Sequence, residues 1–413
     1  MPPLLGGLSG WRAPILLCVD PRLRHVAAAT GVGCGLEDRI PRAEAVDWEA
    51  FADLVERHRV TALVQRSRWP EAHGAPDWLR ERAAAGARRT ALGALRHVAN
   101  LRETLAALET AEIPVVVLKG AALAADAYGD VGARDPGDLD LLVPPERLEP
   151  AGRALAASGL EWRGWGASWR PDADGTDGLS ALAHADRLPM LKHAEFSGRG
   201  VFVELHWQLA GNRHLLPLRS EWLETPRRVH ASGIEIPALP LMAAWWHALV
   251  HGSGHLWMRL KWLADVAGMA HRHPDLLAPE ALHATTEAGL DRSVAAGLLT
   301  AERTFGPFLP DHARTWAARA PGTGPLVRGS LAALARPVVD SGSVSPRALP
   351  RYAAQRLALR GDFRYRAEEV RRMLLEAARE WNEPDPGVRV LARGPRRWVA
   401  RHAGSVRTRI SRR

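Results

Sequence analysis

The stretch from Val115 to Val143 constrains the fold of this chain more than any other. It contains an apolar run, the pair Lys119-Gly120, an alanine-rich segment, and a second apolar run that Asp138 and Asp140 introduce. This order predicts a buried strand, a tight turn, a helix and a second strand. Alternate residues of a strand share a face, so both aspartates should point to one place at the edge of a core.

Two carboxylates on one face repel each other, and a divalent cation relieves the repulsion. Mg²⁺ prefers such oxygen ligands and completes its shell with phosphates. The alternative is that Asp138 and Asp140 only cap a helix or form a turn, a role for which Asp135-Pro136-Gly137 is better suited. We therefore expect these two aspartates to carry chemistry.

A third acid stands in the strand-like run at 201–207, where Glu204 and His206 share one face. A carboxylate within an apolar strand is costly unless it is paired or bound to a metal. Two interpretations follow: Glu204 is the third carboxylate of a metal site, or it pairs with one of the many arginines. The two aspartates favour the first.

The ordered segments LKGAALAADAYGD, RDPGDLDLLV, VELHW and HALVHGSGHLWMRLKWLADVAG resemble a largely uncharacterised bacterial family of nucleotidyltransferases. That family belongs to the superfamily that includes DNA polymerase β. The resemblance covers roughly residues 88–273. It implies a small mixed sheet and transfer of a nucleoside monophosphate from a nucleoside triphosphate such as ATP.

The resemblance also implies roles for single residues. Asp138 and Asp140 would bind two Mg²⁺ ions, and Glu204 would help to activate the acceptor hydroxyl. Gly120 would let the backbone approach the triphosphate. The chain departs from the superfamily pattern at Ala121, where a serine or glycine is usual, and in its longer gap between the glycine and the first aspartate.

Lysine is rare in this chain. Of 55 basic residues, the only lysines are Lys119, Lys192 and Lys261. A compact ammonium on a flexible stem suits a phosphate-binding turn, so we expect Lys119 to contact the nucleotide. Arg134 either contacts phosphates through its planar guanidinium or neutralises a neighbouring aspartate.

A histidine-rich segment follows at 239–273. His247, His251 and His255 recur every four residues, so an unbroken helix would place them on one face as zinc ligands. We expect Gly252 and its neighbour Gly254 to break that helix, which favours structural or substrate-facing histidines. Candidate substrate-facing residues are His206, His251, Arg259 and Lys261, whereas Asp265 is expected to pair with a nearby base.

The whole chain of 413 residues predicts an α/β (α+β) protein with four units. These are a mostly helical region at 1–95, a catalytic core at 96–237, a helical region at 238–382 and an arginine-rich tail at 383–413. Two cysteines, Cys18 and Cys34, make no disulfide framework. The sequence has no evident leader and no apolar run of about 20 residues, so we expect a cytoplasmic protein.

The net charge of +9 comes from the tail, which has nine arginines and no acid after Asp385. Such a segment either forms a basic helix on RNA, an acidic partner or a membrane surface, or only aids solubility. We expect an enzyme acting on a hydroxyl of a small molecule, peptide or protein. The alternatives are a non-catalytic nucleotide or partner binder, antitoxin-like or accessory, and an RNA-directed nucleotidyltransferase. Acceptor, preferred base and oligomeric state are not encoded in any recognisable pattern.

Overall fold

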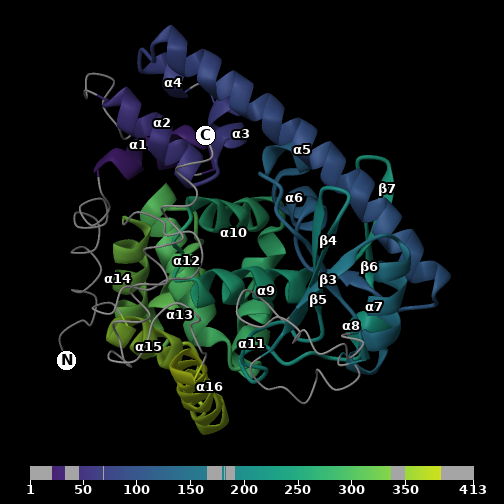
Figure 1. Cartoon of the computed structure of the whole chain (residues 1–413). Helices are drawn as coiled ribbons and strands as arrows, with labels where there is room; N and C mark the ends of the chain where they lie inside the picture. The colour runs from purple at the N-terminus through teal and green to yellow at the C-terminus, as the bar shows by residue number, and fades with distance from the viewer. Residues whose placement is uncertain are drawn as a thin grey trace, which may run out of the picture.

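The computed structural model describes residues 21–32, 46–67, 69–164, 179–180, 182, 191–335 and 349–382. Within these ranges the chain combines a seven-stranded mixed sheet with many helices, which confirms the predicted mixed α/β class (Figure 1). Both cysteines and the arginine-rich tail lie outside the described residues. No described helix has both the length and the apolar character needed to cross a bilayer.

The sheet has the strand order β3-β4-β5-β2-β1-β7-β6. Strand β2 pairs in parallel with β5, and β1 in parallel with β7, whereas the other neighbours are antiparallel. The two strands that carry the predicted acids, β2 and β5, therefore lie side by side in the middle of the sheet. The strands are β1 Val116–Val117, β2 Leu139–Leu142, β3 Glu161–Gly164, β4 His193–Gly198, β5 Val201–His206, β6 Arg227–Ala231 and β7 Ile234–Ala238.

Alternation along β2 sends its side chains into two different cores. Leu139 and Leu141 join the core formed with α5 (Asp77–Thr110) and α7 (Leu148–Ala157). Leu142 joins the larger core formed by the other helices. Burying such a side chain contributes about 1.5–3 kcal/mol, so the register of β2 is strongly specified. Asp140 shares a face with Leu142 and therefore faces the helices.

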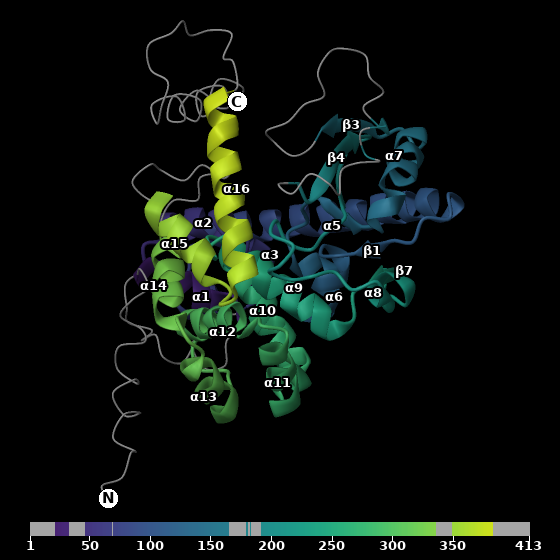
Figure 2. The same cartoon turned by 90° about the horizontal axis from the view of Figure 1, so that it is seen from below.

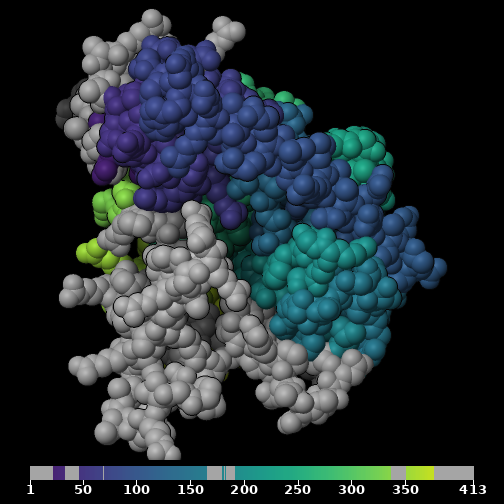
Figure 3. Space-filling model, turned by 45° about the horizontal axis from the view of Figure 1, so that its top comes forward, coloured from purple at the N-terminus to yellow at the C-terminus, as the bar shows by residue number. Residues whose placement is uncertain are grey.

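Helix α5 crosses the whole molecule, and the space-filling view shows it continuous with the N-terminal helices (Figures 1 and 3). Its 34 residues are rich in alanine, leucine and arginine, which have high helix propensity. The shorter elements around the sheet are α6 Ala121–Tyr128, α8 Glu221–Glu224, and the 3₁₀ turns η3 Val131–Ala133 and η4 Pro145–Arg147.

The N-terminal helices pack with the C-terminal ones into one hydrophobic core. Asp47 caps α2 and accepts a hydrogen bond from the backbone N–H of Ala50 at 3.0 Å. The N-terminal helices are α1 Pro21–Ala29, α2 Trp48–Arg57, α3 Thr61–Arg66 and α4 Trp69–Ala72. The C-terminal elements are α9 Leu241–Gly254, α10 Leu260–Arg272, η6 Pro274–Leu277, α11 Pro279–Glu287, α12 Asp291–Phe305, α13 Asp311–Arg319, α14 Thr323–Leu334, α15 Leu349–Ala358 and α16 Phe363–Asn382.

The expectation that Gly252 breaks the histidine-rich helix is wrong. Helix α9 continues through it to Gly254. A side chain at position 252 would collide with the ring of Trp257, because a Cβ there would lie 2.2 Å from a ring carbon. The glycine therefore allows a buried tryptophan to pack against the helix. His247 and His251 lie on this helix, whereas His255 follows its end at Gly254, the second glycine expected to break it.

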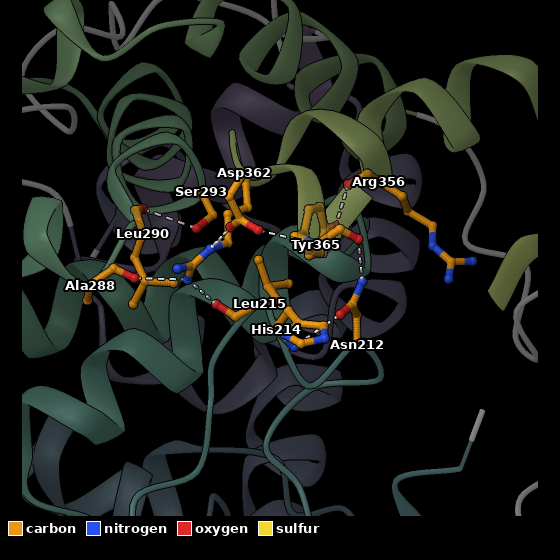
Figure 4. A network of polar contacts seen from close by, with 10 residues as sticks. Asn212, His214, Leu215, Ala288, Leu290, Ser293, Arg356, Asp362 and Tyr365 are labelled. Carbon is orange, nitrogen blue, oxygen red and sulfur yellow. Dashed lines mark hydrogen bonds and ion pairs between the residues drawn. The ribbon is translucent and has the colours of Figure 1, made fainter. Parts of the chain in front are cut away.

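Helix α16 projects from the body of the molecule and is attached near its first turns (Figure 2). The side-chain amide of Asn212 donates to the carbonyl of Tyr365 at 3.0 Å (Figure 4). It also donates to the carboxylate of Glu369 at 2.9 Å. The guanidinium of Arg360 donates to the carbonyl of Ala288 at 2.8 Å. These bonds tie the C-terminal helices to the loop that follows β5.

Candidate active site

The site begins as a grid of polar side chains on one face of three neighbouring strands. In the register, Asp140 of β2 lies opposite Glu204 of β5, and Glu204 lies opposite Glu195 of β4. Two residues further along β5, His206 lies opposite His193 of β4. Because side chains alternate along a strand, all five occupy the same face. The predicted acids of β2 and β5 are therefore brought together.

Short polar contacts join this grid. The ammonium of Lys119, which follows β1, lies 2.8 Å from Oδ1 of Asp140. Nε2 of His206 lies 3.0 Å from Oε2 of Glu204 and 3.3 Å from Oδ1 of Asp140, the oxygen that Lys119 also contacts. Nδ1 of His193 lies 3.6 Å from Oε2 of Glu204. Carboxylates, imidazoles and an ammonium thus meet at one point of the sheet.

The pKa values of the three acids are shifted in different directions. Burial would raise the pKa of Asp140, yet the ammonium of Lys119 and the hydrogen bond from His206 hold it well below its usual range. Burial would also raise the pKa of Glu204. The hydrogen bond from His206 outweighs burial and lowers this pKa to about 2. By contrast, partial burial and the charges of Glu204 and Asp140 raise the pKa of Asp138. Asp138 therefore senses the other two carboxylates directly.

The turn before α6 requires glycine. Gly120 has φ +63° and ψ −126°, a backbone conformation open almost only to glycine. A Cβ at this position would lie 2.7 Å from Nε2 of the buried His97. Ala121 then begins α6, and the first N–H groups of a helix have no partner within it. The turn therefore presents backbone donors and Lys119 beside Asp140.

Helix α9 forms a wall of imidazoles near these groups. The rings of His251 and His255 lie 4.7 Å apart, and those of His247 and His251 lie 6.2 Å apart. Trp262 of α10 packs edge-on against His251, with 5.5 Å between ring centroids. Burial and the charge of Lys119 lower the pKa of His247 to about 3, so this imidazole is neutral.

All three lysines of the chain lie around this site. Lys119 contacts Asp140. Burial lowers the pKa of Lys192, which precedes β4, and the nearby carboxylate of Glu204 opposes that change. Lys261 donates from Nζ to the carbonyl of Asp135 at 2.8 Å, in the loop that leads to Asp138.

Sequence reasoning missed Lys192, His193 and Glu195. The scarcity of lysine is a signal that could have identified Lys192. The alternation His-Ala-Glu on β4, which mirrors Glu-Leu-His on β5, could have identified the other two.

Arg134 has a structural partner. Its Nε lies 3.1 Å and 3.0 Å from the two carboxylate oxygens of Asp265, and both residues are buried. The hydroxyl of Tyr128 donates to the same carboxylate at 3.0 Å. The prediction that Asp265 pairs with a nearby base is confirmed. Arg259 directly precedes α10, and its charge contributes to lowering the pKa of the buried His58.

Carboxylates grouped on the central strands of a sheet, beside a glycine turn and a helix N-terminus, are the arrangement expected of an enzyme that binds phosphates. The family described as uncharacterised nucleotidyltransferases matches residues 44–306, and the chain belongs to it. No curated protein and no solved structure gives a significant match. The match includes every residue of the grid, the glycine turn and the α9 wall.

Proposed function

We propose that this protein is a Mg²⁺-dependent nucleotidyltransferase that transfers a nucleoside monophosphate from a nucleoside triphosphate to a hydroxyl group. The acceptor is a small molecule, a peptide or a protein. The observation that carries the proposal is the pairing of Asp140 with Glu204 on adjacent parallel strands, beside Lys119, with Asp138 directly before β2. Membership of a nucleotidyltransferase family supports the reaction class.

The donor chemistry of the first strand fits Mg²⁺. The carboxylates of Asp138 and Asp140 are hard oxygen ligands. Burial, and next the charges of Glu204 and Asp140, raise the pKa of Asp138, and a cation would offset the repulsion among these carboxylates. Bound there with the triphosphate, Mg²⁺ would neutralise charge on the attacking and leaving oxygens.

The remaining groups bind and orient the substrates. Lys119 and the backbone donors at the start of α6 hold the phosphates, because Ala121 offers no hydroxyl. Glu204 orients the acceptor, whose oxygen bonds to the α-phosphorus while the bond to pyrophosphate breaks. The hydroxyl proton passes through Glu204 to water. With a pKa of about 2, the carboxylate of Glu204 is a weak base, so its main role is to orient the acceptor hydroxyl and it does not keep the proton.

The test measures pyrophosphate release with each nucleoside triphosphate and Mg²⁺, together with equilibrium binding of a non-hydrolysable triphosphate analogue. We expect Asp138→Asn and Asp140→Asn to abolish release, whereas the control Asp77→Asn, an exposed acid at the start of α5, leaves it unchanged. Thermal unfolding verifies that each variant is folded. Undiminished release in a folded Asp138→Asn/Asp140→Asn double variant, or failure of the wild type to bind the analogue, would refute the proposal.

A further inference from the structure

Two histidines stand among the carboxylates where Mg²⁺ alone would not need them. His193, Glu204 and His206 each offer a ligand atom, and these three atoms lie within 4.8 Å of one another. Oδ1 of Asp140 lies 3.3 Å from Nε2 of His206 and adds a fourth donor from the neighbouring strand. The four come from β2, β4 and β5, so their backbones are fixed by the sheet ladder.

The spacing of these atoms is that of ligands around one ion. Two ligands held about 2.1 Å from a tetrahedral ion are about 3.4 Å apart. The observed separations are 3.0 Å between His206 and Glu204, 3.3 Å between His206 and Asp140, and 3.6 Å between His193 and Glu204. The last is too long for a hydrogen bond, and within the described part of the chain Nδ1 of His193 has no hydrogen-bond partner.

The second nitrogen of His193 supports the same conclusion. Its Nε2 faces the carboxylate of Glu195 at 3.6 Å, within ion-pair distance, while Nδ1 on the other side of the ring faces Glu204. An outer carboxylate that orients an imidazole is the usual support of a metal-bound histidine.

We propose that His193, Glu204 and His206, with Asp140, form a second cation site that takes a divalent transition ion of the Mn²⁺, Co²⁺ and Zn²⁺ group. Imidazole nitrogen is a good ligand for these ions and a poor one for Mg²⁺. The two ions of the proposed reaction would then differ: Mg²⁺ with the triphosphate at Asp138, and a transition ion on the histidine side. The inference deepens the proposed function, but the site is measurable without any nucleotide.

The experiment uses the full chain after treatment with a chelator. Calorimetric titration with Zn²⁺, Mn²⁺ and Mg²⁺ should give one tight site, with Zn²⁺ bound at least about 100-fold more tightly than Mg²⁺. We expect His193→Ala to weaken Zn²⁺ binding by at least about 10- to 100-fold, because losing a direct ligand costs no less than losing an outer-shell partner of one. His193→Gln, of similar polarity, should weaken it as well, and serves if the alanine variant does not fold.

Two histidine controls locate the ion. His230→Ala alters an exposed ring on β6 and should bind Zn²⁺ like the wild type. His251→Ala alters the α9 wall and should also retain the tight site. The absorption spectrum of the Co²⁺ form should show nitrogen and oxygen ligands without the thiolate bands that Cys18 or Cys34 would give.

Unchanged Zn²⁺ affinity in folded His193→Ala and His193→Gln, loss of the site in His251→Ala, or equal affinity for Mg²⁺ and Zn²⁺ would each overturn the inference. The proposed function fails differently. If the chain releases no pyrophosphate yet binds Zn²⁺ through His193, the metal site stands and the transferase does not. If release is normal and this Zn²⁺ site is missing, only the metal inference fails.

Discussion

Lys261 offers a test of the electrostatics around the site that needs no substrate. Its side chain is buried on α10, and Nζ donates to the carbonyl of Asp135 at 2.8 Å. Burial, and next the charge of Arg134, lower its pKa from 10.5 to about 7. At about 1.4 kcal/mol for each pKa unit, that difference corresponds to a cost of about 5 kcal/mol for burying the ammonium.

The sign of the pH dependence follows from the lowered pKa. Below pH 7 the lysine is charged in both the folded and the unfolded state, so the whole cost is present. Between about pH 7 and 10.5 the unfolded chain binds more protons than the folded one. The free energy of unfolding should therefore rise with pH, by about 2 kcal/mol in total between pH 7 and pH 9 from this residue.

The assay is urea unfolding of the wild type, Lys261→Met and Lys261→Arg at pH 7, 8 and 9. The methionine variant loses the ammonium cost but leaves the carbonyl of Asp135 without its donor, at about 1–3 kcal/mol, so it should be more stable than the wild type at pH 7. Arginine does not titrate in this range, so Lys261→Arg keeps the charge. Both variants should lack the rise. If the wild type and Lys261→Met change in parallel with pH, the reasoning about this lysine is wrong.

Three further predictions concern stability. Gly120→Ala should lower the free energy of unfolding by about 2 kcal/mol or more, measured by urea unfolding, since the backbone conformation is strained for alanine and the new methyl meets His97. Asp265→Asn should cost about 3–5 kcal/mol in the same assay by leaving the buried Arg134 without its counter-ion, and Arg134→Met/Asp265→Leu should recover most of it. Asn212→Ala should release α16, measured as faster amide hydrogen exchange in that helix with unchanged exchange in α12; equal protection would contradict the role of its amide.

Much of the catalytic sheet could be predicted because its information is local. Alternation along the chain identified β2 and β5 and placed Asp138 and Asp140 on one face before any coordinates. The turn at Gly120 and the helix after it follow from residue type. The strand order depends on pairing between segments about 60 residues apart, and no local pattern encodes it. The residue pattern favoured a site that joins Glu204 to the aspartates, and the strand register shows that Asp140 pairs with Glu204.

Contacts between distant segments account for what the sequence did not predict. The partner of Arg134, Asp265, lies 131 residues away on α10. No sequence motif predicts that α10 packs against α6. Gly252 has a high intrinsic tendency to end a helix, but the ring of Trp257 occupies the space beside it, and packing overrides propensity there. In both cases a residue that suggested function or a break serves the core.

The positions of the lysines relate the composition of the sequence to the candidate site. The chain uses arginine for ion pairs on its surface, as in Arg82 with Glu56 and Arg371 with Glu368, where a permanently charged fork suffices. Its three lysines instead stand at one site, and burial lowers the pKa of Lys192 and Lys261. An arginine at position 261 would remain charged at any pH, whereas Lys261, with a pKa lowered to about 7, can lose or gain its proton near neutral pH. At this position lysine supplies a basic group whose charge can change, which an arginine could not supply.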